Sequence, residues 1–186
     1  MKSAGVVIGF VPLIVYGVLA GYPATGPVFA LAVATVASVV LGYADLRNGM
    51  ILSWANLGLF SGLLFGTGVL GMTWIIPYDS VLIYASLAAV TFGSMAVRKP
   101  FTLQYARGMV DSSLWDNPHF IRVNMEMAGA WGSVFLFNLL LAGITLLSQG
   151  PVAHTAQLLS YGVLLAGCLF TIWYPGYVRK KKTSVS

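Results

Sequence analysis

The chain has 186 residues, of which 58% are hydrophobic and only 8% are charged, and its formal net charge is +5. Too few polar groups are available to cover a water-facing surface, so the composition excludes an ordinary soluble globule and favours a membrane protein. The single cysteine, Cys168, excludes an internal disulfide and a multi-cysteine metal site, and the basic excess is interpreted as a topology signal rather than as a nucleic-acid surface.

Six apolar runs are predicted to cross the membrane, because a helix needs about 20 mostly apolar residues to span the hydrocarbon core. They lack the period-two alternation of barrel strands, so the expected fold is an all-α, polytopic transmembrane helical bundle. The bundle forms one domain, residues 1–178, and a basic tail, residues 179–186, follows it. The predicted spans are Ala4 to Gly21, Thr25 to Tyr43, Ile51 to Met72, Asp79 to Val97, Pro118 to Ser148 and Val152 to Tyr174.

The first run follows Met1 and Lys2 and resembles a secretory signal in its order of charge and apolar residues. The residues Tyr22-Pro23-Ala24 make a poor cleavage site, and similar runs follow, so a retained span is expected. Pro12 is predicted to kink this span or to free a carbonyl group, and a ligand-facing notch is the alternative.

Small residues at four-residue spacing mark one face of the third span and one face of the fourth. Close backbone approach through small residues drives helix association in membranes. We therefore predict an antiparallel hairpin, joined by residues 73–78, in which these two faces touch. The residues are Gly58, Gly62 and Gly66 in the third span and Ala85, Ala89 and Gly93 in the fourth.

Two asparagines lie inside predicted spans, Asn56 in the third and Asn138 in the fifth. Interhelical hydrogen bonds are their ordinary role in a membrane, and lining of a polar cavity is the alternative. Most of the five tryptophans fall near predicted span ends, as interfacial belts require. They are Trp54, Trp74, Trp115, Trp131 and Trp173.

Residues 98–117 are predicted to form a connector between the fourth and fifth spans. The segment Phe101 to Trp115 is too polar to span and too apolar for a free loop, so we expect an element on the membrane surface with Arg107 and Asp111 turned to water. Packing on its own bundle and docking of another protein are both compatible with this pattern. Asn117 and Pro118 have the N-cap and N1 signature of a helix start.

The charges in and after this connector form the one candidate site, either for partner docking or for contact with lipid headgroups. Acid–base chemistry on a lipid is the alternative. Arg122 and Glu126 are also explained as an i, i+4 ion pair. No catalytic residue, cofactor or metal site is predicted, because no standard motif occurs. The candidate residues are Arg98, Lys99, Arg107, Asp111, Asp116, His119, Arg122 and Glu126.

Every lysine and arginine falls on the same side of a six-span arrangement, while Asp79 is the one acid on the other side. By the positive-inside rule both termini are expected in the cytoplasm, and the connector with them.

Several stretches together resemble the intracellular septation protein A (YciB) family of bacterial inner membrane proteins. They are Phe10, Pro12 and Leu13, the AVAT of Ala32 to Thr35, the VLIYASLAAV that leads to Arg98-Lys99-Pro100, and Trp115 followed by an apolar helix with Trp131. The likeness covers most of the chain and is best from Val81 to Leu147.

The resemblance implies a multi-pass protein linked to growth and division of the cell envelope, which contacts membrane lipids and other inner membrane proteins. It supplies no catalytic residues. We therefore expect a non-enzymatic interaction or accessory protein that binds no nucleic acid. The alternative is a small membrane enzyme or carrier that acts on a lipid or isoprenoid at the cytoplasmic face.

Overall fold

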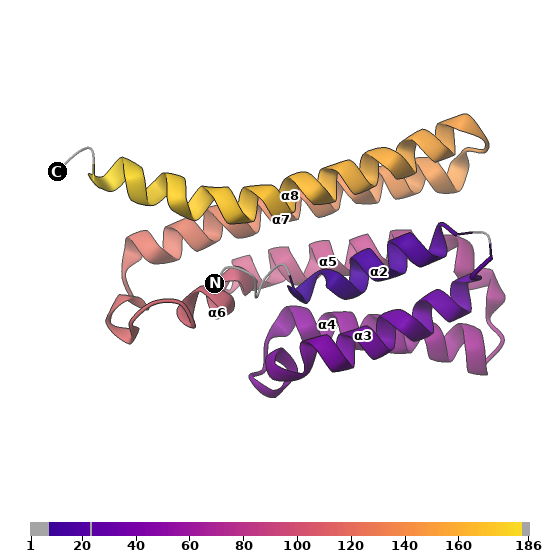
Figure 1. Ribbon diagram of the computed structural model, residues 1–186, viewed down its shortest axis with the longest axis horizontal. Coiled ribbons are helices and arrows are strands. Elements are labelled where there is room, and N and C mark those ends of the chain that lie inside the picture. The colour runs from indigo at the N-terminus through magenta and orange to yellow at the C-terminus, as the bar shows by residue number, and fades with distance from the viewer. Residues whose placement is uncertain (1–7, 23, 184–186) are drawn as a thin grey trace.

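The computed structural model describes residues 8–22 and 24–183, and within these ranges the chain is all-α, without strands (Figure 1). The long helices are α2 (Val11–Ala20), α3 (Pro27–Arg47), α4 (Ile51–Leu64), α5 (Asp79–Ala96), α7 (Pro118–Leu147) and α8 (Pro151–Thr183). Shorter elements are the helix α6 (Phe101–Arg107), the π-helix η1 (Phe65–Val69) and the 3-10 helices η2 (Thr73–Tyr78) and η3 (Ser112–Leu114).

Within the described residues, five segments are long and apolar enough to cross a membrane. They match the second to sixth predicted spans: Pro27–Arg47, Ile51–Val69, Thr73–Ala96, Pro118–Leu147 and Pro151–Val178. The predicted first span begins outside the described residues, and its described part holds a shorter apolar helix, Val11–Ala20. The chain is therefore a multi-pass helical membrane protein by length and composition, and the count of six stays a prediction.

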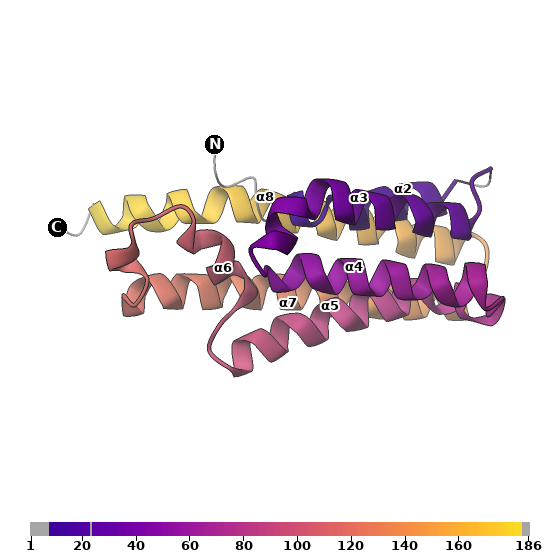
Figure 2. The same cartoon turned by 90° about the horizontal axis from the view of Figure 1, so that it is seen from below.

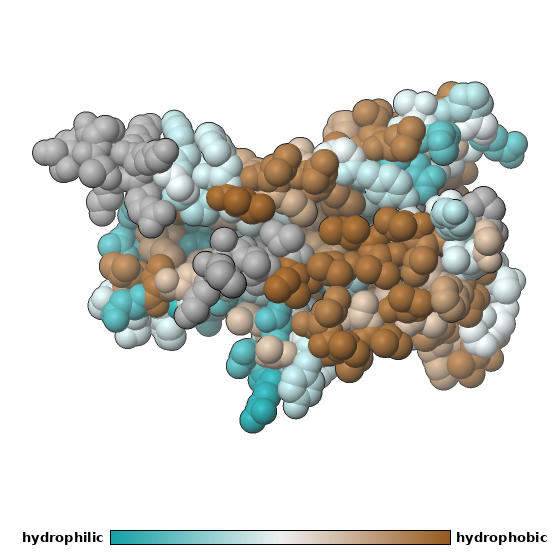
Figure 3. Space-filling view, in the orientation of Figure 1, coloured by the Kyte–Doolittle hydropathy of each residue, from teal (hydrophilic) through white to brown (hydrophobic). Residues whose placement is uncertain are grey.

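The long helices run along one common axis, so the connecting segments gather at two ends (Figures 1 and 2). The turn end holds η2 and residues 148–150, and the connector end holds residues 48–50 and 98–117. Hydrophobic side chains cover the face over α2 and α3, while hydrophilic ones gather toward the ends (Figure 3). This is the distribution that a bilayer requires of a helical bundle.

Helix α7 is central to the packing, since it lies against α5, α6 and α8, while α3 lies between α2 and α4. Helices α7 and α8 have 30 and 33 residues. At 1.5 Å per residue they are about 45–50 Å long, more than a hydrocarbon core of about 30 Å requires. Both project past α3, α4 and α5 at the connector end (Figure 1). The first turns of α7 therefore emerge from the bundle.

An aromatic cluster joins the start of α2 to α6, α7 and α8. The Phe10 and Trp131 rings stack with centroids 4.1 Å apart, and Phe101 meets Phe10 edge-on at 6.4 Å. Trp131 is fully buried, and its indole N–H donates a 2.9 Å hydrogen bond to Thr171 Oγ1 on α8. A Cβ atom at Gly167 would lie 3.1 Å from the indole ring, so this glycine permits the close approach of α8. Trp131 is thus a core residue and not an interfacial one.

Pro12 lies in the first turn of α2, and the helical structure is interrupted two residues before it, at Phe10; the sequence predicts that this proline kinks the span or frees a carbonyl group. The Asn56 side-chain N–H donates a 2.8 Å hydrogen bond to the carbonyl oxygen of Gly9, just before this interruption. Asn138 Oδ1 accepts a hydrogen bond from Ser160 Oγ on α8. Both asparagines therefore join different helical segments, and their predicted interhelical role is confirmed.

The predicted contact between the small-residue faces of α4 and α5 is wrong, although the two helices do form a hairpin. No atom of a neighbouring element lies within 4 Å of a Cβ built at Gly58, Gly62 or Gly93, and Ala89 is exposed. Gly66 is buried, but its neighbour is Ile75 of η2. The error arises because the glycines lie on a different face of α4 from its buried residues. Helix α4 buries the row Leu52, Asn56, Phe60 and Leu63, and the glycines lie two residues, about 200°, away from it.

Candidate functional site

The connector packs on its own bundle. Four residues of α6 are buried: Phe101, Thr102, Leu103 and Tyr105. Thr102 Oγ1 donates a 2.8 Å hydrogen bond to the carbonyl oxygen of Asn124 on α7, and Gln104 Oε1 accepts one of 2.9 Å from the backbone N–H of Ile51. The apolar side chains of α6 therefore serve the core and are not available for docking.

Tyr105 belongs to a small polar cluster below α6. Its hydroxyl lies 3.5 Å from Ser53 Oγ, which in turn donates a 3.3 Å hydrogen bond to Asp45 Oδ2. Burial, reinforced by the nearby Asp45 carboxylate, raises the pKa of Tyr105 to about 12, so its hydroxyl stays protonated. The cluster ties α3, α4 and α6 together.

Arg107, Asp111 and Asp116 surround η3 and mainly serve its local structure. The Arg107 guanidinium lies 5.2 Å from the centre of the Trp115 ring, whose N–H donates a 3.2 Å hydrogen bond to the Arg107 carbonyl oxygen. Arg107 and Asp116 form an exposed ion pair at 4.0 Å, a type that contributes little stability. Asp111 caps η3 by accepting a hydrogen bond from the Ser113 N–H, and this bond holds the pKa of its carboxyl below the usual value.

The start of α7 has the predicted cap, because Asn117 Oδ1 accepts a 2.9 Å hydrogen bond from the His119 backbone N–H. The Arg122 side chain donates to Glu126 Oε1 at 3.1 Å, which is the i, i+4 pair that the sequence suggested. Tyr174 on α8 donates to the other oxygen of Glu126. Sequence reasoning missed this third member, since nothing in the chain relates α8 to the start of α7.

The eight candidate residues thus fall into separate groups: Arg98 with Lys99, then Arg107 with Asp111 and Asp116, then His119 with Arg122 and Glu126. All are exposed or only partly buried. None of the eight lines a cavity that lies between the helices toward the turn end. Within the described residues, no group of three or more His, Cys, Asp or Glu side chains is placed to hold a metal ion.

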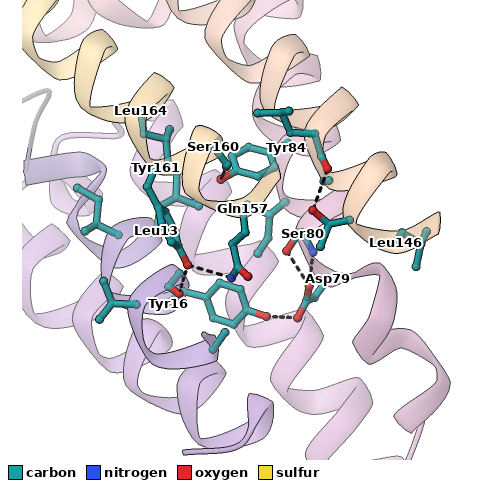
Figure 4. A pocket seen from close by; sticks show the side chains of 18 of the residues that line it. Leu13, Tyr16, Asp79, Ser80, Tyr84, Leu146, Gln157, Ser160, Tyr161 and Leu164 are labelled. Carbon is teal, nitrogen blue, oxygen red and sulfur yellow. Dashed lines mark hydrogen bonds between the residues drawn. The ribbon is translucent and has the colours of Figure 1, made fainter. Parts of the chain in front are cut away.

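That cavity is a crevice of about 670 Å³ between α2, η2, α5, α7 and α8 (Figure 4). Its volume lies within the range of about 300–1,000 Å³ that small-molecule sites occupy. Ile14 and Val18 on α2 and Leu165 on α8 line it and are 41%, 60% and 60% exposed, so its mouth opens sideways between these two helices. Most of the other lining is apolar, including Leu13, Ile83 and Leu164.

Within the described part of the chain, Asp79 is the only charged residue that lines the crevice. It occupies the first turn of α5, where a carboxylate is stabilised by the helix dipole, and its Oδ1 accepts from the Ser80 N–H. Tyr16 reaches across from α2 and donates its hydroxyl to Asp79 Oδ2 (Figure 4).

Two further tyrosines line the crevice. The Tyr161 hydroxyl on α8 donates a 2.7 Å hydrogen bond to the Gly17 carbonyl oxygen on α2 and accepts one of 3.0 Å from Gln157 Nε2. The Tyr84 hydroxyl on α5 lies 3.1 Å from Ser160 Oγ on α8. Hydrogen bonds from tyrosines therefore link α8 to α2 and to α5 across the crevice.

Sequence reasoning did not identify this set, because it followed charge density to the connector end. One signal was present. Asp79 is the only acid that the predicted topology assigns to the side without lysine or arginine, and a carboxylate at a membrane boundary usually has a partner. The tyrosines carried no signal, since tyrosine is an ordinary interfacial residue.

Comparisons with protein-family models, with curated proteins and with solved structures find no match to this chain. The resemblance to the intracellular septation protein A family therefore stays a prediction.

Proposed function

We propose that this protein is a non-enzymatic, multi-pass protein of the bacterial inner membrane that holds one lipid molecule in the crevice at its turn end. It would serve the cell envelope as an accessory protein, either by presenting this lipid to other membrane proteins or by using it to stabilise contacts with them. The resemblance noted in the sequence supports the membrane and the envelope, and the crevice supports the lipid.

The observation that carries the proposal is the position of the crevice mouth. It opens between α2 and α8 through exposed apolar side chains, on helical surfaces that face hydrocarbon in a bilayer. A crevice in such a place is entered by lipid rather than by water. Among its polar groups, Asp79 comes from the first turn of α5 and Gln157 from the second turn of α8, near the turn end, where a lipid head would lie.

The distribution of cations supports an orientation. The described lysines and arginines that precede α8 lie at the connector end: Arg47, Arg98, Lys99, Arg107 and Arg122. By the positive-inside rule this end faces the cytoplasm, together with both termini. The crevice would then lie in the outer half of the membrane and take its lipid from the outer leaflet.

Catalysis at the cytoplasmic face has less support. General acid–base chemistry needs an acid and a base within reach of one substrate position. The charged groups at the connector end are instead distributed over exposed surfaces, where Arg122 with Glu126 and Asp111 with the Ser113 N–H are already paired. Docking through α6 is likewise disfavoured, because its apolar side chains are buried.

The proposal is tested by blocking the crevice with a large side chain and measuring whether the purified protein still retains a lipid. Ala20 lines the crevice and is exposed, so Ala20→Trp should obstruct it without disturbing the core, and Ala89→Trp places the same side chain on an exposed face of α5 away from it. After mild detergent purification, native mass spectrometry should find one bound lipid on the original protein and on Ala89→Trp, but not on Ala20→Trp. Equal retention by both variants, or no retained lipid on the original protein, would contradict the proposal.

A further inference from the structure

We infer that the crevice selects a lipid whose head donates hydrogen bonds and carries no net negative charge. This inference rests on the proposed function, and it names the class of lipid that the same site would take.

The first observation concerns the hydroxyl groups of the crevice. Six hydroxyls line it, each with a single hydrogen to donate: Tyr16, Ser80, Tyr84, Thr145, Ser160 and Tyr161. Tyr16 and Ser80 both donate to Asp79, Thr145 donates to the Leu141 carbonyl oxygen at 3.0 Å, and Tyr161 donates to that of Gly17.

The remaining two hydroxyls form a directed chain. Ser160 donates to Asn138 Oδ1, so in its 3.1 Å contact with Tyr84 the serine oxygen is the acceptor and Tyr84 is the donor. All six hydroxyl hydrogens of the crevice are therefore used within the protein. A ligand head that accepts hydrogen bonds finds none of them free.

The acceptors of the crevice are not used up in the same way. A carboxylate accepts about four hydrogen bonds, and Asp79 accepts three, from Tyr16 and from the N–H and hydroxyl of Ser80. Within the described residues, nothing donates to the Gln157 side-chain carbonyl oxygen, and one of the two N–H groups of its amide is directed to Tyr161. Among the side-chain amide and hydroxyl groups, the crevice thus offers free acceptors on Asp79 and on the Gln157 oxygen against one free donor, the second Gln157 N–H, so a head that donates makes more hydrogen bonds than one that only accepts.

Charge favours the same class of head. No lysine, arginine or histidine among the residues that the structure describes lines the crevice, so the Asp79 carboxylate would face an anionic phosphate or sulfate without a compensating cation. Like charges this close disfavour binding, whereas an ammonium or hydroxyl group forms charge-assisted hydrogen bonds with a carboxylate.

The apolar part of the crevice contributes little to the selection of one lipid over another. A lipid chain gains almost nothing by leaving the bilayer for a protein surface, because both are equally apolar. Selectivity must therefore come from the head, and it can be measured with lipids that share one chain.

The experiment uses four such lipids on the full-length protein in detergent: oleyl alcohol, oleylamine, oleyl methyl ether and oleyl sulfate. Cys168 lines the crevice and is the only cysteine of the chain, so its protection from a methanethiosulfonate reagent reports occupancy. We expect the alcohol and the amine to protect at concentrations about tenfold lower than the ether and the sulfate, the effect of one hydrogen bond to a charged group. Native mass spectra of the same samples count the bound lipid, and they decide the outcome where the thiol reacts slowly.

Asp79→Asn is the matched variant, because it removes the charge at nearly the same size, although its single amide oxygen keeps either the hydrogen bond from Tyr16 or those from Ser80. It should reduce the advantage of oleylamine over oleyl sulfate and also that of the alcohol over the ether, because both depend on a hydrogen bond to the charged carboxylate. Equal binding of all four lipids by the original protein would overturn the inference but not the proposed function. Binding of none of them would overturn both.

Discussion

At the scale of single residues, several polar side chains of this protein join helices to one another. Trp131 is bonded to Thr171, Asn56 to Gly9 and Tyr161 to Gly17, in each case between different helical segments. In a membrane the apolar surfaces give little net drive for helix association, so such bonds and close packing hold the bundle together.

Tyr105 offers a test at this scale. Its pKa is about 12 in the folded protein against an ordinary value of 10.0, so the stability that this group contributes is fully present below pH 10 and is lost as the pH rises through 12. Tyr105→Phe should lower the free energy of unfolding by about 0.5–1.5 kcal/mol at neutral pH, the usual effect of one hydrogen bond. Unfolding in detergent between pH 8 and 12 should show a smaller alkaline loss for the variant. An identical alkaline loss in both proteins would mean that Tyr105 is not buried as described.

At the scale of elements, helix phase decides which residues meet. In α5 the buried residues are Ile83, Tyr84, Leu87, Ala88, Thr91 and Ser94. Ala89 and Gly93 lie on the opposite side, in the same way that Gly58 and Gly62 lie opposite the buried row of α4. The exposed small residues of these two helices therefore face the surroundings of the bundle and not its interior.

A pair of substitutions in α4 tests this assignment. Phe60→Ala removes a fully buried side chain and should lower the free energy of unfolding by about 3–5 kcal/mol. Gly62→Ala adds a methyl group in open space. It should raise the free energy of unfolding by no more than about 1 kcal/mol, because alanine has the higher helix propensity. Both values come from unfolding curves in the same detergent. If Gly62→Ala lowered the free energy of unfolding as much as Phe60→Ala does, Gly62 would be in contact with a neighbouring helix, as first predicted, and the assignment of the buried face would be wrong.

The sequence was sufficient for most of the architecture and insufficient for the site. Length and hydropathy located five spans, and the Asn117-Pro118 signature located the start of α7, because both depend on local residues. Small-residue spacing gave the wrong contact face, since many residues at that spacing never approach another helix. The crevice joins Tyr16, Asp79 and Tyr161, which are far apart in the chain, and only the helix packing brings them together.

At the scale of the whole molecule, the two ends differ in kind. The connector end is built from exposed charges and a packed cap, α6, while the turn end holds a mainly apolar crevice with one carboxylate and three tyrosines. In the proposed orientation the protein fixes its topology from the cytoplasmic side and binds lipid from the outer leaflet.

Photolabelling in lipid nanodiscs tests this account most directly. A photoreactive oleyl alcohol, with a diazirine in its chain, should label crevice residues such as Leu13, Leu164 and Cys168, and an excess of unlabelled oleyl alcohol should suppress this labelling. Exposed residues outside the crevice, such as Leu140 and Leu169, should be labelled weakly and without competition. Labelling spread evenly over the exposed apolar residues, with no site that competes, would contradict a lipid-binding crevice.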